Sequence, residues 1–326
     1  MPDLHHSLKI GLIGVSHWHM PFYMPGLTGH TVVGVCDEQL PLTADSYARR
    51  FSCPSYVSSQ ELLTQAKPDF VLAFAPHSRM KELAMILIQR RIGFSMEKPI
   101  GLDASEVAQV ATAARQAGVF VSIPLVWRCS QWLRDWKQRL KTEEIIHLSF
   151  RFIAGAPDRY LQSSPWMLDR ASAGSGCMTN LGPHFLDMAL YLTDSQKAHV
   201  VGSRFQYASN YNVETYASVL LEFPGGATMS LETGYAFPME DGVKRENRWN
   251  AVTKKGYHTL ADGYLEERRF GEPVVRMAVD TDSDVYYASY IRKTLSAYAA
   301  CLPPAVSIDD MLRVRILLDQ ILQSSR

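Results

Sequence analysis

The chain has 326 residues, of which 47% are hydrophobic and 20% charged, a balance typical of a globular protein with a substantial apolar core. This length exceeds one ordinary domain and suits two. Lysine plus arginine equals aspartate plus glutamate, at 33 each, so no basic excess indicates binding to nucleic acid or to an anionic membrane. No apolar run is long enough to span a bilayer.

The N-terminal sequence and the distribution of cysteines indicate the cellular compartment in which we expect the protein. The first residues lack the apolar segment behind a basic end that a secretory signal requires. The five cysteines are scattered and odd in number, and no Cys-x-x-Cys occurs. This distribution argues against a disulfide framework and a structural zinc site. We therefore expect a cytoplasmic protein without a resident metal.

Strands alternate with helices through the first 124 residues. Apolar runs predict strands at residues 8–15, 31–36, 70–74, 93–96 and 119–123. Helical spacing predicts helices at residues 21–27, 42–51, 61–65, 79–91 and 104–118. This alternation predicts an N-terminal Rossmann domain, residues 1–124, with a doubly wound parallel sheet. Ligands of such sheets bind beyond the carboxyl ends of the strands.

Residues 125–326 have a different pattern. Strands are expected at residues 145–153, 200–207, 215–223, 228–236 and 249–253. Helices are expected at residues 133–140, 182–192, 284–301 and 308–323. Turns such as Pro224-Gly225-Gly226 suit hairpins. We predict an α+β domain with a large, mostly antiparallel open sheet, whose final helix can pack back on the first domain.

The segment after the first expected strand has the position of a dinucleotide-binding turn. The fingerprint uses glycines for a tight turn, for approach of the pyrophosphate and for helix packing, and here these positions hold Gly14, Ser16 and His19. Asp37 ends the second strand, about 20 residues on, where a carboxylate binds ribose hydroxyls and repels a 2′-phosphate. We therefore predict NAD, with NADP as the alternative. The competing interpretation is that Asp37 only caps a loop.

Further residues at these strand ends are candidates for cofactor contacts. They are His17 and Trp18 in the turn, and Ala75 and Pro76 after the third strand. His17 and His19 could also ligate zinc, but no third ligand is evident nearby in the sequence. We favour packing and cofactor contact for both histidines.

Two motifs carry a resemblance to a known family. Glu97-Lys98-Pro99 follows the strand at residues 93–96, and a glycine-rich segment reads Gly174-x-Gly176-x-x-x-Asn180-x-Gly182-x-His184-x-x-Asp187. With the N-terminal pattern and the closing segment from Ser307, they resemble the glucose-fructose oxidoreductase, inositol dehydrogenase and rhizopine-catabolism family, written Gfo/Idh/MocA. The resemblance covers nearly the whole chain. It implies NAD(P)-dependent oxidation or reduction of sugars and polyols.

The resemblance also implies roles for individual residues. Lys98 would hydrogen-bond the reacting hydroxyl, and His184 would exchange its proton, with Asn180 in support. This agrees with the chemistry, because hydride leaves a carbon only as the hydroxyl proton is removed by a base with a pKa near neutral. A nearby lysine favours the developing alkoxide. Glu97 would orient the loop and contact the cofactor, and Pro99 would shape the turn through a cis peptide bond.

Four positions depart from the family pattern. Asn180 stands where the family has aspartate, the glycine fingerprint holds Ser16 and His19, and Met80 replaces a common histidine. An amide orients an imidazole but does not stabilise an imidazolium as a carboxylate does. The alternative hypothesis is therefore a catalytically impaired regulatory homologue that binds nucleotide or sugar.

Aromatic residues and one arginine in the loops are candidates for substrate contacts. Trp127, Arg128, Tyr160 and Trp166 suit stacking on sugar faces and hydrogen bonds to hydroxyls, whereas the competing interpretation is ordinary packing and a solvated arginine. The apolar strands of the second domain predict a homodimer or homotetramer through its sheet, because such an exposed face favours association.

Overall fold

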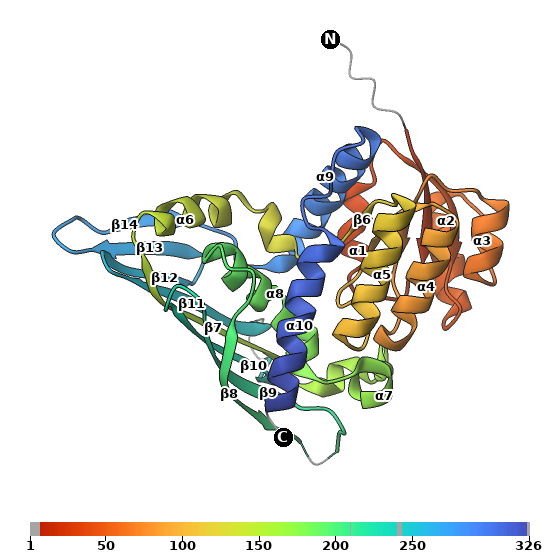
Figure 1. Ribbon diagram of the computed structural model, residues 1–326. Coiled ribbons are helices and arrows are strands. Elements are labelled where there is room, and N and C mark those ends of the chain that lie inside the picture. Colours follow the sequence, from red (N-terminus) through yellow and green to blue (C-terminus); the bar gives the residue numbers. More distant parts are fainter. Residues whose placement is uncertain (1–6, 209, 240–242, 325–326) are drawn as a thin grey trace, which may run out of the picture. The chain divides into compact units, whose positions relative to one another are not determined.

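The computed structural model describes residues 7–208, 210–239 and 243–324 (Figure 1). The chain divides into two compact units. The first comprises the residues up to Cys129 together with Asp284–Leu312, and the second comprises Ser130–Ser283 and the residues from Arg313. Both units are therefore discontinuous in sequence. A division at residue 124 does not describe the return of Asp284–Leu312 to the first unit.

The first unit is built on a parallel sheet of six strands in the order β3-β2-β1-β4-β5-β6. The strands are β1 (Lys9–Ile13), β2 (Thr31–Cys36), β3 (Ser55–Tyr56), β4 (Phe70–Ala73), β5 (Gly93–Met96) and β6 (Val121–Ser122). The helices are α1 (Met20–Tyr23), α2 (Pro41–Phe51), α3 (Ser59–Gln65), α4 (His77–Gln89), α5 (Ala104–Ala117) and α9 (Tyr287–Ala299). This confirms the predicted Rossmann fold.

Local sequence explains where these elements begin and end. β4 is buried along its whole length, as the central strand of a parallel sheet is when helices cover both faces. The side chain of Asp103 caps α5 by accepting a hydrogen bond from the Glu106 N–H. Gly118 ends that helix in the left-handed conformation, with φ +64°, which glycine adopts at no steric cost.

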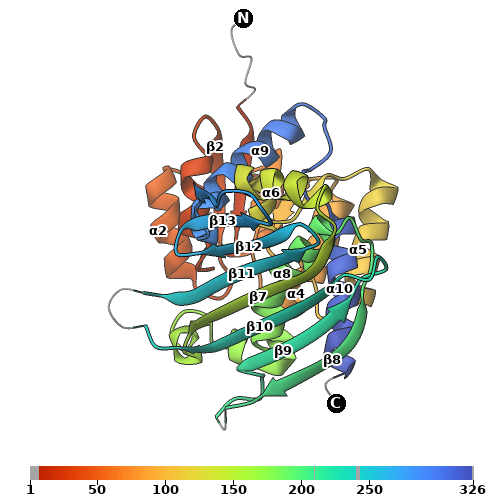
Figure 2. The same cartoon turned by 90° about the vertical axis from the view of Figure 1, so that its left-hand side faces the viewer.

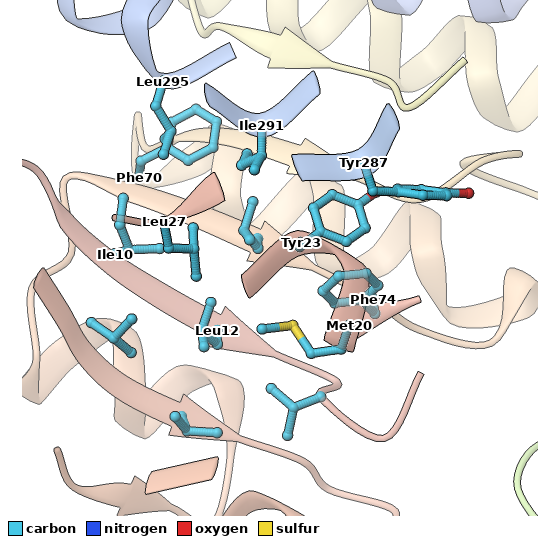
Figure 3. Packing of buried hydrophobic residues seen from close by; sticks show 14 of the residues in the cluster. Ile10, Leu12, Met20, Tyr23, Leu27, Phe70, Phe74, Tyr287, Ile291 and Leu295 are labelled. Carbon is cyan, nitrogen blue, oxygen red and sulfur yellow. The ribbon is translucent and has the colours of Figure 1, made fainter. Parts of the chain in front are cut away.

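Helix α9 completes the apolar core of the first unit, although it lies more than 150 residues beyond β6 in sequence. Tyr287, Ile291 and Leu295 pack in one cluster with residues of β1, α1 and β4 (Figure 3). The buried Tyr290 hydroxyl lies 2.9 Å from the Ser95 Oγ and 2.8 Å from the Ser122 Oγ. These contacts attach α9 to β5 and β6, the two neighbouring strands at one edge of the parallel sheet.

The second unit is built on an eight-stranded sheet in the order β14-β13-β12-β11-β7-β10-β9-β8 (Figure 2). The strands are β7 (Ile145–Gly155), β8 (His199–Gln206), β9 (Tyr216–Glu222), β10 (Thr228–Phe237), β11 (Arg245–Thr253), β12 (Gly256–Ala261), β13 (Tyr264–Arg269) and β14 (Val275–Ala278). Only the pairing of β7 with β10 is parallel among the pairs of the described strands. The predicted mostly antiparallel sheet is confirmed.

Helices α6 (Gln131–Lys141) and α8 (Cys177–Leu192) belong to the same unit, with α8 packed on β10. Along β9, Ala217, Val219 and Leu221 are buried while Ser218 and Leu220 are exposed. One face of the sheet is therefore covered and the other is open, and Figure 2 shows the strands in front of α8. The last helix, α10 (Ile308–Ser324), passes from the first unit into the second.

Two sequence-based boundaries need correction. Helix α8 begins at Cys177, five residues before the predicted start, because Gly182 and Pro183 lie inside the helix. The predicted strand at residues 249–253 begins at Arg245, and the hairpin strands β12 to β14 were not predicted. Among the described residues, no helix has both the length and the apolar character required to cross a membrane.

Candidate active site

The turn after β1 requires glycine at its first position. Gly14 has φ +76°, and a Cβ there would lie 2.1 Å from the Phe74 carbonyl oxygen. Its N–H donates to the Cys36 carbonyl oxygen at 2.8 Å. The positive φ of Gly14 and the short distance to the Phe74 carbonyl oxygen both exclude a side chain at this position. Gly14 thereby allows the turn to lie against the carboxyl ends of β2 and β4.

Asp37, at the end of β2, holds this turn in place. Its Oδ2 accepts a hydrogen bond from the Ser16 N–H at 2.7 Å, and its Oδ1 accepts from Gln39 and Leu40. The interpretation of Asp37 as a loop cap is therefore seen directly. A carboxylate offers about four acceptor positions, so three backbone donors leave capacity for a ribose hydroxyl. The ribose role of Asp37 stays a prediction.

His19 occupies the place of the third fingerprint glycine and contacts Glu97 in the loop after β5. Its Nδ1 lies 2.9 Å from Glu97 Oε1, which also accepts a hydrogen bond from the Tyr23 hydroxyl at 2.9 Å. The Tyr287 hydroxyl lies 2.9 Å from the same nitrogen of His19. Burial opposes ionisation of Glu97, but His19, His17 and Lys98 together outweigh it and hold the pKa of Glu97 well below its usual range. The large residue at this position thus has a definite partner.

Lys98 lies at the carboxyl end of β5 with its side chain buried. Burial lowers the pKa of Lys98 to about 8, although the negative charge of Glu97 opposes that shift. The Lys98–Pro99 peptide bond is cis, as predicted. A lysine that titrates near physiological pH can donate a hydrogen bond to an alkoxide and can also exchange a proton.

The metal interpretation needs one correction. The sequence showed no third ligand near His17 and His19, but the fold brings Glu97 to them, with ligand atoms within 4.8 Å of one another. These atoms already serve a hydrogen-bonded network, since His17 Nδ1 accepts from the His19 N–H and Glu97 binds His19 and Tyr23. Burial lowers the pKa of His17 well below its ordinary value. We therefore interpret His17, His19 and Glu97 as parts of a hydrogen-bonded network and not as metal ligands.

Asn180 and His184 lie one turn apart on α8, and both are buried. The start of this helix is fixed by Glu214, whose Oε2 accepts from the Gly176 N–H at 2.7 Å and whose Oε1 accepts from the Met178 N–H at 2.9 Å. A carboxylate is favourable at a helix N-terminus. A Cβ on Gly176 would lie 2.0 Å from the Glu214 carbonyl oxygen, which explains one glycine of the glycine-rich segment.

The amide of Asn180 binds two tyrosines. Its Nδ2 donates to the Tyr160 hydroxyl at 2.9 Å and to the Tyr235 hydroxyl at 3.0 Å. The two rings pack edge to face, with centroids 5.6 Å apart. Burial raises the pKa of Tyr235 well above its ordinary value, so this hydroxyl stays protonated. Tyr160, predicted as a substrate contact, therefore belongs to a polar cluster of the second unit.

The remaining predicted residues lie in loops of either unit. Trp127 and Arg128 lie in the short helix Val126–Cys129, where Trp127 is buried and Arg128 pairs with Asp310 at 3.2 Å. Arg128 is therefore engaged by a carboxylate and is not simply solvated, whereas its contact with a sugar stays a prediction. Trp166 lies half-buried in the turn Pro165–Leu168.

Two further predictions concern the third parallel strand. Ala75 and Pro76 lie between β4 and α4, beyond the carboxyl end of the strand, as predicted. Met80 is fully buried on α4. Trp18, also predicted near the cofactor, stacks on the ring of His17 with centroids 3.9 Å apart.

Sequence reasoning missed several residues of these clusters. They are Tyr23, Tyr287, Glu214, Arg159 and Tyr235. Each makes its contact across a long separation in sequence or from a loop without a motif, such as the 268 residues between His19 and Tyr287. For Arg159 the sequence offers a local signal, because this residue directly precedes Tyr160, a predicted substrate contact.

Comparison with known families identifies the chain. Residues 8–124 match the model described as the oxidoreductase family with an NAD-binding Rossmann fold, and residues 131–258 match the GFO/IDH/MocA C-terminal domain. The chain belongs to the GFO/IDH/MocA family. The resemblance seen in the sequence motifs is thereby confirmed.

The chain is similar in sequence to several enzymes, and their names show that they act on different substrates. The chain is 26% identical over 201 residues to trans-1,2-dihydrobenzene-1,2-diol dehydrogenase of Sus scrofa, and the match covers 60% of this chain and 58% of that enzyme. It is 21% identical over 310 residues to dTDP-3,4-didehydro-2,6-dideoxy-alpha-D-glucose 3-reductase of Saccharopolyspora spinosa, covering 93% and 90%. The chain thus matches less than two thirds of the length of the diol dehydrogenase.

Solved structures show the same fold. Levoglucosan dehydrogenase in complex with NADH and levoglucosan superposes with a TM-score of 0.86 at 14% identity, covering 98% of this chain and 97% of that one. GenD2 from gentamicin A biosynthesis, in complex with NAD, has a TM-score of 0.84 at 18% identity, covering 98% and 94%.

Proposed function

We propose that the protein is an NAD-dependent oxidoreductase that acts on a secondary alcohol, or the corresponding ketone, of a sugar, inositol or related polyol. The observation that carries this proposal is Lys98, a buried amine at the carboxyl end of a parallel strand. Its lowered pKa, about 8, suits proton exchange near neutral pH. The family of NAD-binding oxidoreductases and the names of its relatives support the same class.

The residues of the first unit fit the nicotinamide cofactor. Gly14 removes the side chain that would obstruct the turn, and Asp37 anchors the turn through Ser16. We assign cofactor contacts to this turn, to Ala75 and Pro76 after β4, and to the loop that begins at Glu97. The bound nicotinamide would accept or supply the hydride.

Lys98 and His184 would manage the proton of the reacting hydroxyl. In the oxidation direction, the carbon loses a hydride and its hydroxyl loses a proton, which His184 accepts. Lys98 donates a hydrogen bond to the oxygen as negative charge develops there. Asn180 supports His184 from one helical turn away. The regulatory alternative rests on Ser16, His19 and Asn180. The side chains of His19 and Asn180 have hydrogen-bonding partners, whereas Ser16 donates only its backbone N–H to Asp37.

Titration with NADH and NADPH, read by energy transfer from the six tryptophans, tests the cofactor assignment. We expect micromolar binding of NADH, in the ordinary range for enzyme substrates, and weaker binding of NADPH. A preference for NADPH would contradict the role of Asp37. A panel of sugars and polyols then tests turnover. The Lys98→Met variant should keep NADH binding and lose most turnover, whereas wild-type turnover would refute the assignment of Lys98.

We also propose that copies of the chain associate through the open face of the eight-stranded sheet, as a homodimer or homotetramer. Exposed Leu220 lies on this face, and Tyr216 and Arg151 bind Glu232 there. Light scattering should show an oligomer that Leu220→Lys weakens, and a monomeric wild type would contradict the proposal.

All five cysteines lie within the described residues and form no disulfide, which supports our assignment to the reducing cytoplasm.

A further inference from the structure

Arg159 lies on a platform formed by two tyrosine rings in the second unit. Its guanidinium carbon lies 4.7 Å from the ring centre of Tyr160 and 5.3 Å from that of Tyr235. Its Nη2 donates to the Tyr160 hydroxyl at 2.8 Å. Contact with two aromatic rings orients the guanidinium plane and reduces the freedom lost on binding a ligand.

The positive charge of Arg159 has no carboxylate partner among the residues that the structure describes. The adjacent carboxylate, Asp158, accepts a hydrogen bond from the Tyr211 hydroxyl. A guanidinium carries five N–H donors, and within the described part of the chain Arg159 uses one of them for a hydrogen bond to a side chain, the Tyr160 hydroxyl. Since Arg159 is half-buried, it combines access to solvent with partial loss of hydration, which strengthens binding of an anion.

Asn180 explains why this charge is uncompensated. Arg159 and Asn180 both donate to the same Tyr160 oxygen, so the two side chains are held within one polar cluster. An aspartate at position 180 would accept from both tyrosine hydroxyls and place a negative charge beside Arg159. The neutral amide instead leaves the cluster with the full charge of the arginine, one helical turn from His184.

We propose that Arg159 binds an anionic group of the substrate, a carboxylate or a phosphate, through the planar fork of its guanidinium. The substrate class is thereby narrowed to acidic sugars, namely sugar acids, sugar phosphates or nucleotide sugars. This inference rests on the proposed function, because it assumes that the ligand of the second unit is the sugar. Arg159 acts in recognition and leaves proton transfer to Lys98 and His184.

Equilibrium binding measured by calorimetry in the presence of NAD tests the inference without requiring turnover. The probes are D-glucuronate, D-glucose 6-phosphate, UDP-glucose and neutral D-glucose. We expect the best acidic probe to bind about 10- to 100-fold more tightly than glucose, the range of one charge-assisted pair. Tight binding of glucuronate alone would identify a carboxylate, and tight binding of the other two acidic probes would identify a phosphate.

Variants separate the role of the charge from a structural role. Arg159→Gln should abolish the preference for the acidic probe, and Arg159→Lys should retain part of it, because lysine keeps the charge but lacks the fork. Arg204→Gln, at an exposed position on β8, is the matched control and should bind as the wild type does. Asn180→Asp should weaken acidic probes by pairing with Arg159. Thermal unfolding of each variant checks that it is folded.

The outcomes distinguish this inference from the proposed function. If the wild type binds NADH and oxidises a neutral polyol, while Arg159→Gln changes neither acidic nor neutral binding, the inference is wrong and the proposed function stands. If the acidic probes bind through Arg159 but NADH does not bind, the proposed oxidoreductase fails and anion recognition stands. Equal binding of acidic and neutral probes to the wild type also overturns the inference. With turnover, Arg159→Gln should raise KM for the acidic substrate and change kcat little.

Discussion

Replacing Lys98 with methionine should stabilise the first unit at neutral pH while it removes catalysis. Lysine ordinarily titrates near 10.5, and burial lowers the pKa of Lys98 to about 8. One pKa unit corresponds to about 1.4 kcal/mol, so the charged amine costs the folded protein about 3 kcal/mol below pH 8. Methionine fills a similar volume without a charge. For a unit of this size, the midpoint of thermal unfolding should rise by about 6–12 °C.

The pH dependence of this effect has a definite sign. Between pH 8 and 10.5 the unfolded state binds more protons at Lys98 than the folded state, so wild-type stability rises with pH in this window. The advantage of Lys98→Met is therefore full below pH 8 and disappears as the pH rises toward 10.5. Calorimetry at pH 7 and pH 10 measures it, with turnover measured on the same samples.

An exposed lysine provides the control. Lys9→Met, at the exposed start of β1, should change stability by less than about 0.5 kcal/mol at either pH. A Lys98→Met variant that is no more stable than the wild type at pH 7 would refute the desolvation argument. A gain that persists unchanged above pH 10.5 would show that packing of the methionine, and not removal of a buried charge, is responsible.

Three further substitutions test other buried polar contacts. His19→Gly restores the fingerprint glycine but removes a donor of Glu97, so it should cost about 1.5–3 kcal/mol in urea unfolding, and an unchanged midpoint would contradict the role of this pair. Tyr290→Phe removes the hydroxyl that lies against both Ser95 and Ser122 and should cost about 1–2 kcal/mol, seen as a lower melting temperature. Glu143→Gln breaks the buried pair with His258 and should cost about 3–5 kcal/mol at pH 7. Burial opposes ionisation of Glu143, but hydrogen bonds from His258, Thr253 and Arg269 together outweigh it and lower the pKa of Glu143. This stabilisation is therefore lost as the pH falls through the carboxyl range, and the variant should show a flatter acid profile.

The buried strands of the first unit were predictable because their signal is local. The segments Thr31–Cys36 and Gly93–Met96 match the predicted strands residue for residue, since each is an apolar run that ends at a turn or a charged residue. In β12 and β13 the polar and charged residues are adjacent, as in Glu266–Arg269, so the apolar signal of these strands is weak. Their turn, Asp262-Gly263, has positive φ at both residues and is a typical hairpin signal, so it could have located them.

The residues of the candidate site likewise fall into those that the sequence predicts and those that only the fold reveals. Lys98 and Gly14 could be predicted because each belongs to a motif whose residues are adjacent in sequence. The contact of His19 with Glu97 spans 78 residues, and only the parallel order of the strands brings the two together. A sequence motif reports which residues follow a strand, whereas the partner of each side chain depends on the packing of several elements.

The departures from the family pattern acquire a common physical meaning in this structure. His19 replaces a glycine and Asn180 replaces an aspartate, and each contacts tyrosine hydroxyls, Tyr287 in one unit and Tyr160 in the other. The first substitution adds an imidazole beside a buried carboxylate, and the second removes a carboxylate beside Arg159. The second change makes the charge around Arg159 more positive. Such a shift would favour a substrate that brings negative charge, so Asn180 fits altered specificity better than loss of catalysis.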